Sequence, residues 1–454
     1  MGTADEATPR VLDPFQQFFS LERDVLVLSL AMFAFSLGFQ MTHRFLPDYM
    51  FHLGATGLIV GLFGALGNII ATVFPYYGGV VSDRIGSRYS LTLFGLLSTI
   101  GFAVWLLAGI VPTISLGSLI LEPWVWIFVG LLLAQAWKSF GLGATYAIVK
   151  QSVEPGRLAR GFASTETFRR SAFLLAPLIV LVFVADDLMP GFLWVLAIAV
   201  AFGLIATAAQ HRLYDAGHDT VGKKFAGVGQ LVDDLQSLPP ALKPLLIADT
   251  LVRFANGMVY IFFILVITEF FEIGLTLSLP VLGTVSLSPP AFFALLLAVE
   301  MIIALVTMAP TARLAEVVGL KPVVTLGFVV YAVFPVLFIY APENALVLVV
   351  LFAFSGLRFA GLPAHKALIV GPAETGAGGR VTGSYYFVRN LIVIPSALIG
   401  GLLWDGITDP ISGAEVIGAS PELAFTLASA IGLIGVVYFL LFGREFDAYN
   451  PARA

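Results

Sequence analysis

The sequence contains no cysteine and few charged residues. Asp, Glu, Lys and Arg make up 12% of its 454 residues, against about 25% in soluble domains. Without cysteine there are no disulfide bonds, thiolate metal sites or cysteine nucleophiles. The five histidines lack metal-ligand spacing, and neither a phosphate-binding glycine loop nor an HExxH motif is present. We therefore expect no enzyme, no cofactor, no metal site and no ATP-driven pump, and the sequence has no basic domain for nucleic acid.

The chain is instead rich in long apolar runs. Its mean hydropathy is +0.95, and 59% of its residues are hydrophobic. Twelve runs have about 20 or more residues, the length that crosses a hydrocarbon core of about 30 Å. They cover residues 24–50, 56–78, 89–111, 124–149, 161–184, 191–211, 244–272, 289–311, 322–341, 344–369, 381–404 and 421–443. We predict an all-α protein with twelve transmembrane helices in a lipid bilayer.

The connections between these runs alternate in their content of basic residues. Those near 51–55, 112–123, 185–190, 273–288, 342–343 and 405–420 contain no Lys or Arg, whereas the others and both ends of the chain are basic. By the positive-inside rule, both termini face the cytoplasm of a multi-pass protein in the plasma membrane. The apolar connection 273–288 is expected to be a packed loop, with a re-entrant segment as the alternative.

An internal repeat divides the chain into two halves. A shift of 220 residues, without gaps, aligns Lys138 with Arg358 and Arg169 with Arg389, together with several glycines and alanines around them. A repeat this long indicates a duplicated domain. We predict two pseudo-symmetric six-helix bundles, residues 24–211 and 244–443. A cytoplasmic linker, 212–243, joins them, and cytoplasmic segments 1–23 and 444–454 flank them.

The loop between the second and third runs carries a motif that identifies a family. It reads Gly79-Val80-Val81-Ser82-Asp83-Arg84-Ile85-Gly86-Ser87-Arg88, and residues 312–321 repeat its acid, glycine and base as Glu316, Gly319 and Lys321. This resembles the signature loop of the major facilitator superfamily (MFS), and the resemblance covers nearly the whole chain. It implies the MFS fold and a conformational latch between the halves, formed by Gly79, Asp83, Arg84, Gly86, Arg88, Glu316, Gly319 and Lys321.

Several cations fall within the apolar runs. A fixed charge at the bilayer centre costs about 2.5 to 3.5 kcal/mol on insertion scales and therefore indicates function. Transporters built from repeated halves hold their substrate at this depth, and arginine binds carboxylate or phosphate bidentately. The candidate substrate-binding residues are Lys138, Arg358, Arg253, Arg169 and Arg389. The resemblance implies that Lys138, Arg358 and Arg253 lie on the wall of the central cavity.

Acidic residues at the same depth are fewer. Glu300, Asp249 and Glu166, against six cations that include Arg170, leave an excess of three positive charges. These three acids are the candidates for ion coupling, because burial raises the pKa of a carboxylate whereas a nearby arginine lowers it. Arg44 and His43, beside Asp48, are expected at the interface or at an outer gate, and His365 and Lys366 are interpreted as topology signals.

These observations favour a secondary active transporter. The leading hypothesis is a monomer that moves a small organic anion or phosphorylated metabolite by alternating access with proton coupling. The alternatives are an exporter of amphipathic or drug-like compounds and a non-transporting assembly or sensing protein. The drug/proton antiporters of the family carry a glycine- and proline-rich motif in the fifth run, whereas here the stretch SAFLLAPLIVLVFV has Pro177 but no glycine, which argues against this class.

Overall fold

The computed structural model describes residues 23–116, 119–141, 158–185, 187–214, 238–279, 283–370, 378–408 and 415–445. Each of the twelve apolar runs contains helix. In the first half the helices are α2 (Arg23–His43), α3 (Leu46–His52), α4 (Gly57–Ile85), α5 (Ser87–Ala108), α6 (Val125–Ala134), α7 (Ala136–Ser139), α9 (Leu158–Phe183) and α10 (Leu188–Leu213).

The second half repeats this order. Its elements are η2 (Pro240–Leu242), α12 (Lys243–Val259), η3 (Tyr260–Phe262), α13 (Phe263–Leu265), η4 (Val266–Phe270), α14 (Pro289–Val318), α15 (Leu320–Ile339), α16 (Ala345–Gly356), η5 (Leu357–Phe359), α17 (Leu362–Val370), α18 (Gly378–Val393), α19 (Ser396–Asp405) and α20 (Pro421–Phe442). Among the described residues, ten helical stretches are long and apolar enough to cross a membrane, and α6–α7 and α9 occupy the two remaining positions. The predicted fold class is confirmed.

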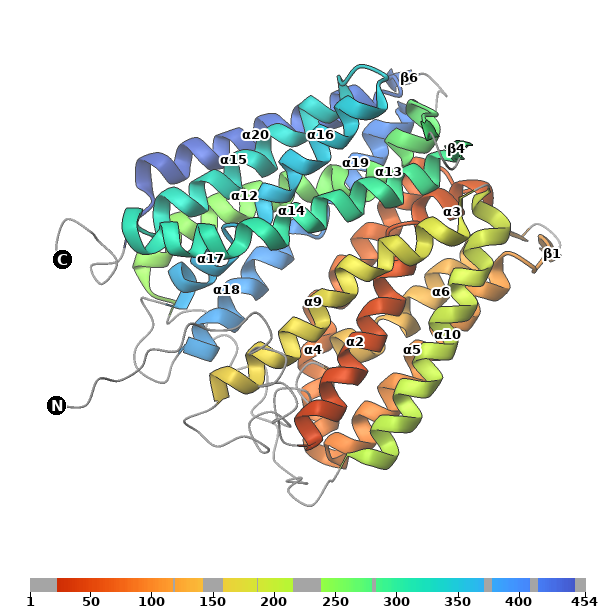
Figure 1. Cartoon of the computed structure of the whole chain (residues 1–454), viewed down its shortest axis with the longest axis horizontal. Coiled ribbons are helices and arrows are strands. Elements are labelled where there is room, and N and C mark those ends of the chain that lie inside the picture. Colours follow the sequence, from red (N-terminus) through yellow and green to blue (C-terminus); the bar gives the residue numbers. More distant parts are fainter. Residues whose placement is uncertain are drawn as a thin grey trace.

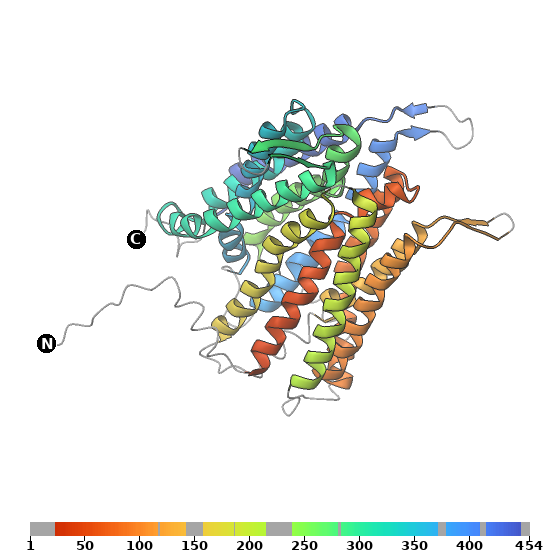
Figure 2. The same ribbon diagram turned by 45° about the vertical axis from the view of Figure 1, so that its right-hand side comes forward.

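The two halves form separate groups of helices that approach each other at one end and diverge toward the other (Figures 1 and 2). Three short antiparallel hairpins lie at the end where the groups meet. They are β1 (Ile114–Leu116) with β2 (Leu119–Leu121), β3 (Leu275–Leu279) with β4 (Gly283–Leu287), and β5 (Ile407–Thr408) with β6 (Glu415–Ile417). Each hairpin lies in a connection without Lys or Arg, so we call this the hairpin end and the opposite one the basic end. The hairpin in 273–288 replaces the plain loop that we expected there.

Helix α4 of the first half packs closely against α19 of the second at the hairpin end. A Cβ atom added to Gly61 would lie 2.6 Å from the Ala397 carbonyl oxygen, and one added to Gly401 would lie 2.5 Å from the Gly57 carbonyl oxygen. Only glycine permits this backbone approach. The seam therefore joins the two halves without space for a solute between these helices.

A carboxylate from the second half caps the first turn of α4. The Asp405 Oδ1 atom accepts a hydrogen bond from the Gly57 backbone N–H at 2.8 Å, and its Oδ2 atom accepts one from Leu58 N–H. These donors have no partner within the helix, and the positive end of the helix dipole favours an anion there. A second pair of contacts joins the halves at the same end, because Ser288 donates from its N–H to the Ala185 carbonyl and from its hydroxyl to the Val184 carbonyl.

Two glycines of the signature loops make equivalent sharp turns. Gly86, between α4 and α5, has φ +85°, and Gly319, between α14 and α15, has φ +92°. This left-handed backbone conformation disfavours any residue with a Cβ atom. The repeat thus reproduces the turn although the first glycine of the motif is Ala312 in the second half.

The last basic residue of each loop binds within its own half. Arg88 Nε donates to the His211 carbonyl at the end of α10 (2.8 Å), and Lys321 Nζ donates to the Leu440 carbonyl near the end of α20 (3.0 Å). Both cations meet the negative end of a helix dipole. These contacts tie each loop to the last helix of its bundle, and a latch between the halves stays a prediction.

We predict that Gly319→Ala lowers the free energy of unfolding by about 1 to 2 kcal/mol, because alanine is strained at positive φ. The matched control is Gly383→Ala in α18, where an added Cβ atom meets nothing within 4 Å and alanine should stabilise the helix by about 0.5 to 1 kcal/mol. Denaturation of both variants in mixed micelles measures the difference. Equal stability of the two variants would contradict the requirement for glycine at residue 319.

We further predict that Asp405→Ala weakens the closure of the hairpin end. The chain has no cysteine, so Ala71→Cys, at a residue that lines the central cavity, provides a single labelling site. A membrane-impermeant maleimide supplied from the hairpin end should label this site several-fold faster when Asp405 is replaced. Glu343→Ala, at an exposed acid of the same end, should leave the rate unchanged, and an unchanged rate in both variants would exclude Asp405 as a closing contact.

Candidate substrate chamber

A cavity of about 280 Å³ lies between the two halves, and we call it the central chamber. Helices α2, α4, α7, α12 and α18 contribute to its wall. Four cationic side chains line it, Arg44, Lys138, Arg253 and Arg389, together with His43 and the amides Asn68, Gln135, Asn256 and Asn390. Among the residues that the structure describes, no aspartate or glutamate lines it. An anion in this chamber would therefore meet charged and neutral hydrogen-bond donors from both halves.

Lys138 lies beyond a break in its membrane helix. The break falls at Gln135, between α6 and α7, and Arg358 lies at the equivalent place in the 3₁₀ turn η5 after α16. Such discontinuous helices commonly mark substrate sites in transporters. The Lys138 side chain is exposed to the chamber, with its Nζ atom 4.0 Å from the centroid of the Phe39 ring. Among the described side chains, no carboxylate lies within ion-pair distance of this ammonium.

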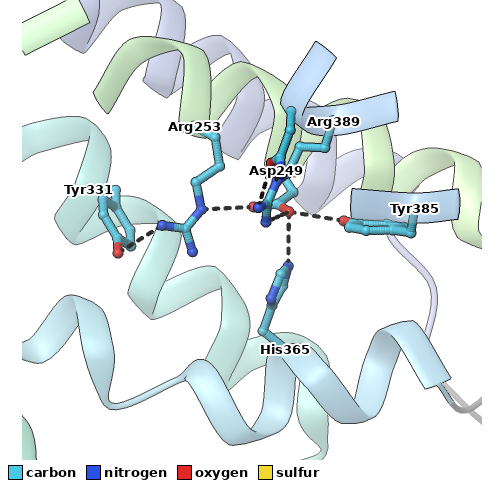
Figure 3. Close-up of polar contacts among 7 residues, drawn as sticks. Asp249, Arg253, Tyr331, His365, Tyr385 and Arg389 are labelled. Carbon is cyan, nitrogen blue, oxygen red and sulfur yellow. Dashed lines mark hydrogen bonds and ion pairs between the residues drawn. The ribbon is translucent and has the colours of Figure 1, made fainter. Parts of the chain in front are cut away.

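Asp249 does not line the central chamber but pairs with two of the arginines that do (Figure 3). Its Oδ1 atom lies 3.3 Å from Arg253 Nε, and its Oδ2 atom lies 3.2 Å from Arg389 Nη1. The Tyr385 hydroxyl donates to Oδ2 at 3.2 Å, and His365 Nε2 lies 3.3 Å from the same oxygen. The carboxylate is fully buried, so these four partners offset the cost of removing its charge from water. The cluster joins α12, α17 and α18.

The two arginines held by Asp249 make further contacts that orient them. Arg253 Nη1 donates to the Tyr331 hydroxyl at 3.0 Å (Figure 3), and Arg389 donates to Asn390 Oδ1 from Nε at 3.1 Å and from Nη2 at 2.9 Å. Arg253 and Arg389 remain 22% and 16% exposed. Part of each guanidinium group therefore stays available to a solute in the chamber.

Arg358 forms a separate, closed ion pair. Its Nη2 atom lies 2.7 Å from Glu300 Oε1, which also accepts a hydrogen bond from the Ser355 hydroxyl, and the Arg358 side chain is only 1% exposed. The rings of Tyr331 and Phe359 lie 5.3 Å and 4.8 Å from its guanidinium carbon, within cation–π range. Arg358 thus faces α14 and is absent from the lining of the central chamber, unlike Lys138, its partner in the repeat.

Arg44 connects this ion pair to the central chamber. Its Nη2 atom lies 3.8 Å from Glu300 Oε2, and its guanidinium carbon lies 3.8 Å from the centroid of the Tyr260 ring. The contact with Glu300 crosses from the first half to the second. Arg44 lies inside the protein, at the junction of the halves. The internal repeat did not point to it, because the equivalent residue 220 positions later is Ile264.

The predicted site residues divide into groups. Lys138, Arg253 and Arg389 meet at the central chamber, Arg169 lines a neighbouring chamber described below, and Arg358 is paired with Glu300. Of the coupling candidates, Asp249 and Glu300 are paired with arginines, and the Glu166 side chain lies outside the described residues. The side chains of Asp83 and Glu316 in the signature loops also lie outside them.

The sequence did not indicate the surroundings of three further residues. Arg44 lines the chamber, and His365 contacts Asp249, where we expected only a topology signal. Asp48 in α3 is fully buried, and within the described residues neither of its carboxylate oxygens meets the geometry of a hydrogen bond. The nearest charged contact of Asp48 is His52 Nδ1 at 3.7 Å, and such a poorly paired carboxylate is costly to bury as an anion.

No protein-family model matches the chain. An uncharacterized MFS-type transporter of Methanocaldococcus jannaschii is 24% identical to it over 425 residues, which cover 92% of this chain and 95% of the relative. Among solved structures, the nucleoside transporter NupG superposes with a TM-score of 0.71 at 14% identity and covers 92% of this chain and all of its own. A POT family transporter in complex with 5-aminolevulinic acid gives 0.66 at 14% identity and covers 94% and 99%.

We predict that Arg358 and Glu300 stabilise the folded protein only when both are present. Arg358→Met removes the nearest cation of the buried Glu300 carboxylate, and Glu300→Gln removes the carboxylate that pairs with the buried Arg358 guanidinium group. Each substitution should therefore lower the free energy of unfolding by about 3 to 5 kcal/mol. The double variant Arg358→Met/Glu300→Gln should recover most of this loss. Denaturation of the four proteins in mixed micelles gives the coupling energy, and additive losses would contradict the pairing.

Proposed function

The chain belongs to the major facilitator superfamily, and from that premise we propose that it moves a small organic anion or a phosphorylated metabolite across the membrane by alternating access. It is a transporter of the MFS type, and its relatives and structural neighbours are transporters.

The observation that carries the proposal is the excess of positive charge at the central chamber. Arg44, Lys138, Arg253, Arg389 and Arg358 lie in or beside it, and Asp249 and Glu300 are the carboxylates paired with them. Within the described part of the chain, these five cations with two anions leave three positive charges to be balanced. Water in the chamber reduces this cost, and an anionic substrate would reduce it further while gaining charge-assisted hydrogen bonds.

Each charged group has a distinct role in this proposal. Lys138, with its ammonium free of described carboxylates, supplies a point charge from the first half. Arg253 and Arg389 supply planar donors from the second half, held in place by Asp249. The substrate therefore bridges the two halves, as alternating access requires of a ligand that is bound in both conformations. Arg358 stabilises Glu300 and does not contact the substrate directly.

Proton coupling would follow from competition for the same arginines. An anion that binds Arg253 and Arg389 draws them away from Asp249, and a buried carboxylate that loses its cations favours the protonated form. We propose that Asp249 takes up the coupled proton in this way. Glu300 keeps Arg358 as a partner at 2.7 Å and is less exposed to this competition.

The conformation described here would be the inward-facing one. The α4–α19 seam and the Asp405 cap close the hairpin end, and the positive-inside rule assigns the basic end to the cytoplasm. Outward opening then requires separation of α4 from α19, with loss of the two hydrogen bonds to Asp405. Under this scheme the substrate enters or leaves the central chamber from the basic end in the present state.

The proposal is tested by ligand-induced thermal stabilisation of the purified protein. Inorganic phosphate, small carboxylates and sugar phosphates should stabilise the wild type. Lys138→Ala should lose this effect, with affinity at least tenfold lower, because a charge-assisted hydrogen bond contributes about 1.5 to 3 kcal/mol. Lys243→Ala, which removes an exposed cation at the basic end, is the control and should bind normally.

Two outcomes would overturn the proposed substrate class. Stabilisation by lipophilic cations with no response to anions would favour an exporter of amphipathic or drug-like compounds. Anion binding that is equally strong in Lys138→Ala would place the binding site elsewhere. Uptake of the stabilising anion into proteoliposomes, with and without an inward proton gradient, then tests the coupling, and Asp249→Asn should make uptake independent of that gradient.

A further inference from the structure

A second cavity of about 210 Å³ adjoins the central chamber, and we call it the side chamber. It lies where α9 of the first half packs against α14 of the second, which run side by side in Figure 1. Arg44 and Tyr260 line both cavities. These two side chains, in contact with each other at 3.8 Å, form the partition between the chambers.

The side chamber differs from the central chamber in its chemistry. Its wall is mainly apolar and includes the side chains of Phe173, Leu297, Met301 and Met308. Methionine adapts its shape to irregular ligands, because its side chain is unbranched and its sulfur is polarizable. An apolar cavity of about 150 Å³ is large enough to bind a benzene ring. The side chamber can therefore take an apolar group of at least that size.

The charged groups of the two chambers favour one orientation of an amphipathic guest. Glu300 lines the side chamber and not the central one, and it pairs with Arg358 at 2.7 Å and with Arg44 at 3.8 Å, so its charge is already balanced within the protein. The described lining of the central chamber instead combines four cationic side chains with amide groups and contains no carboxylate, so an anionic head group is better bound there. Arg169 and Arg170 also line the side chamber, and both make interactions of their own. The methylene groups of these two arginines can pack against an apolar part of a ligand.

We propose that the transported substrate is an amphipathic anion, whose charged head binds in the central chamber while its apolar body passes Arg44 and Tyr260 into the side chamber. This inference rests on the proposed function, since it takes from it the anionic head group. It narrows the substrate class from anions in general to those with an apolar chain or ring, such as medium-chain carboxylates. It also accounts for an apolar chamber next to a polar one in a single substrate path.

The test uses a series of straight-chain carboxylates from acetate to decanoate, with binding to the purified wild type measured by titration calorimetry. Affinity should rise about fourfold for each added methylene, equivalent to about 0.8 kcal/mol, and should level off once the chain fills the side chamber. Ala304→Phe fills that cavity from α14. This variant should bind acetate as the wild type does and lose most of the gain with chain length.

Two further variants keep the test decisive. Ala304 is buried, so a phenylalanine there could disturb folding; Leu305→Trp, at a residue that lines the same cavity and is 40% exposed, should give the same result. Ile302→Phe is the control on α14, since Ile302 is 46% exposed and does not line the cavity. It should retain the full dependence on chain length.

The outcomes separate this inference from the proposed function. If acetate and longer carboxylates bind with equal affinity, the side chamber does not hold the substrate, and the anion site stands alone. If the gain with chain length is unchanged in Ala304→Phe and Leu305→Trp, it reflects partitioning into detergent, and the inference is wrong. If inorganic phosphate binds but no carboxylate of any length does, this inference alone is wrong, and if neither phosphate nor any carboxylate binds, the proposed function itself fails.

Discussion

The constraint on which this structure depends is the positive charge held in the middle of an apolar helical protein. Each cation at this depth costs free energy unless water, an acid or an aromatic face compensates it. The protein uses all three. Glu300 and Asp249 pair with arginines, the rings of Tyr260 and Phe39 lie against Arg44 and Lys138, and the remaining charge faces a chamber. Under the proposed function, the substrate provides the compensation that the protein lacks.

The same constraint explains why the two halves are no longer alike. A common position in the repeat carries Lys138 in one half and Arg358 in the other, both beside a break in a membrane helix. Of these two cations, only Arg358 meets an acid among the described side chains, because α14 supplies Glu300 next to it. Arg358 is therefore paired within its own half, whereas Lys138 borders the central chamber. Equivalent positions of the repeated fold thus have different surroundings.

The sequence predicted the fold well, because its signals are local and repeated. Apolar runs of sufficient length, the alternation of basic loops and the 220-residue repeat define the helices and their pairing. It also identified Lys138, Arg253 and Arg389, which converge on one chamber. It did not predict which acid each cation meets, because Glu300 and Arg358 lie on different helices and no spacing rule links them. Arg44, His365 and the cap formed by Asp405 depend on such tertiary contacts as well.

The central claim is that an anion occupies the chamber between Lys138 and the arginine pair held by Asp249. Crystals of the protein grown with selenate or bromoacetate test it most directly, since anomalous scattering locates the heavy atom without a prior model of the ligand. The account predicts an anomalous peak within hydrogen-bonding or contact distance of Lys138, Arg253 and Arg389. A central chamber without such a peak, in crystals that show the anion bound at another place on the protein, would contradict it.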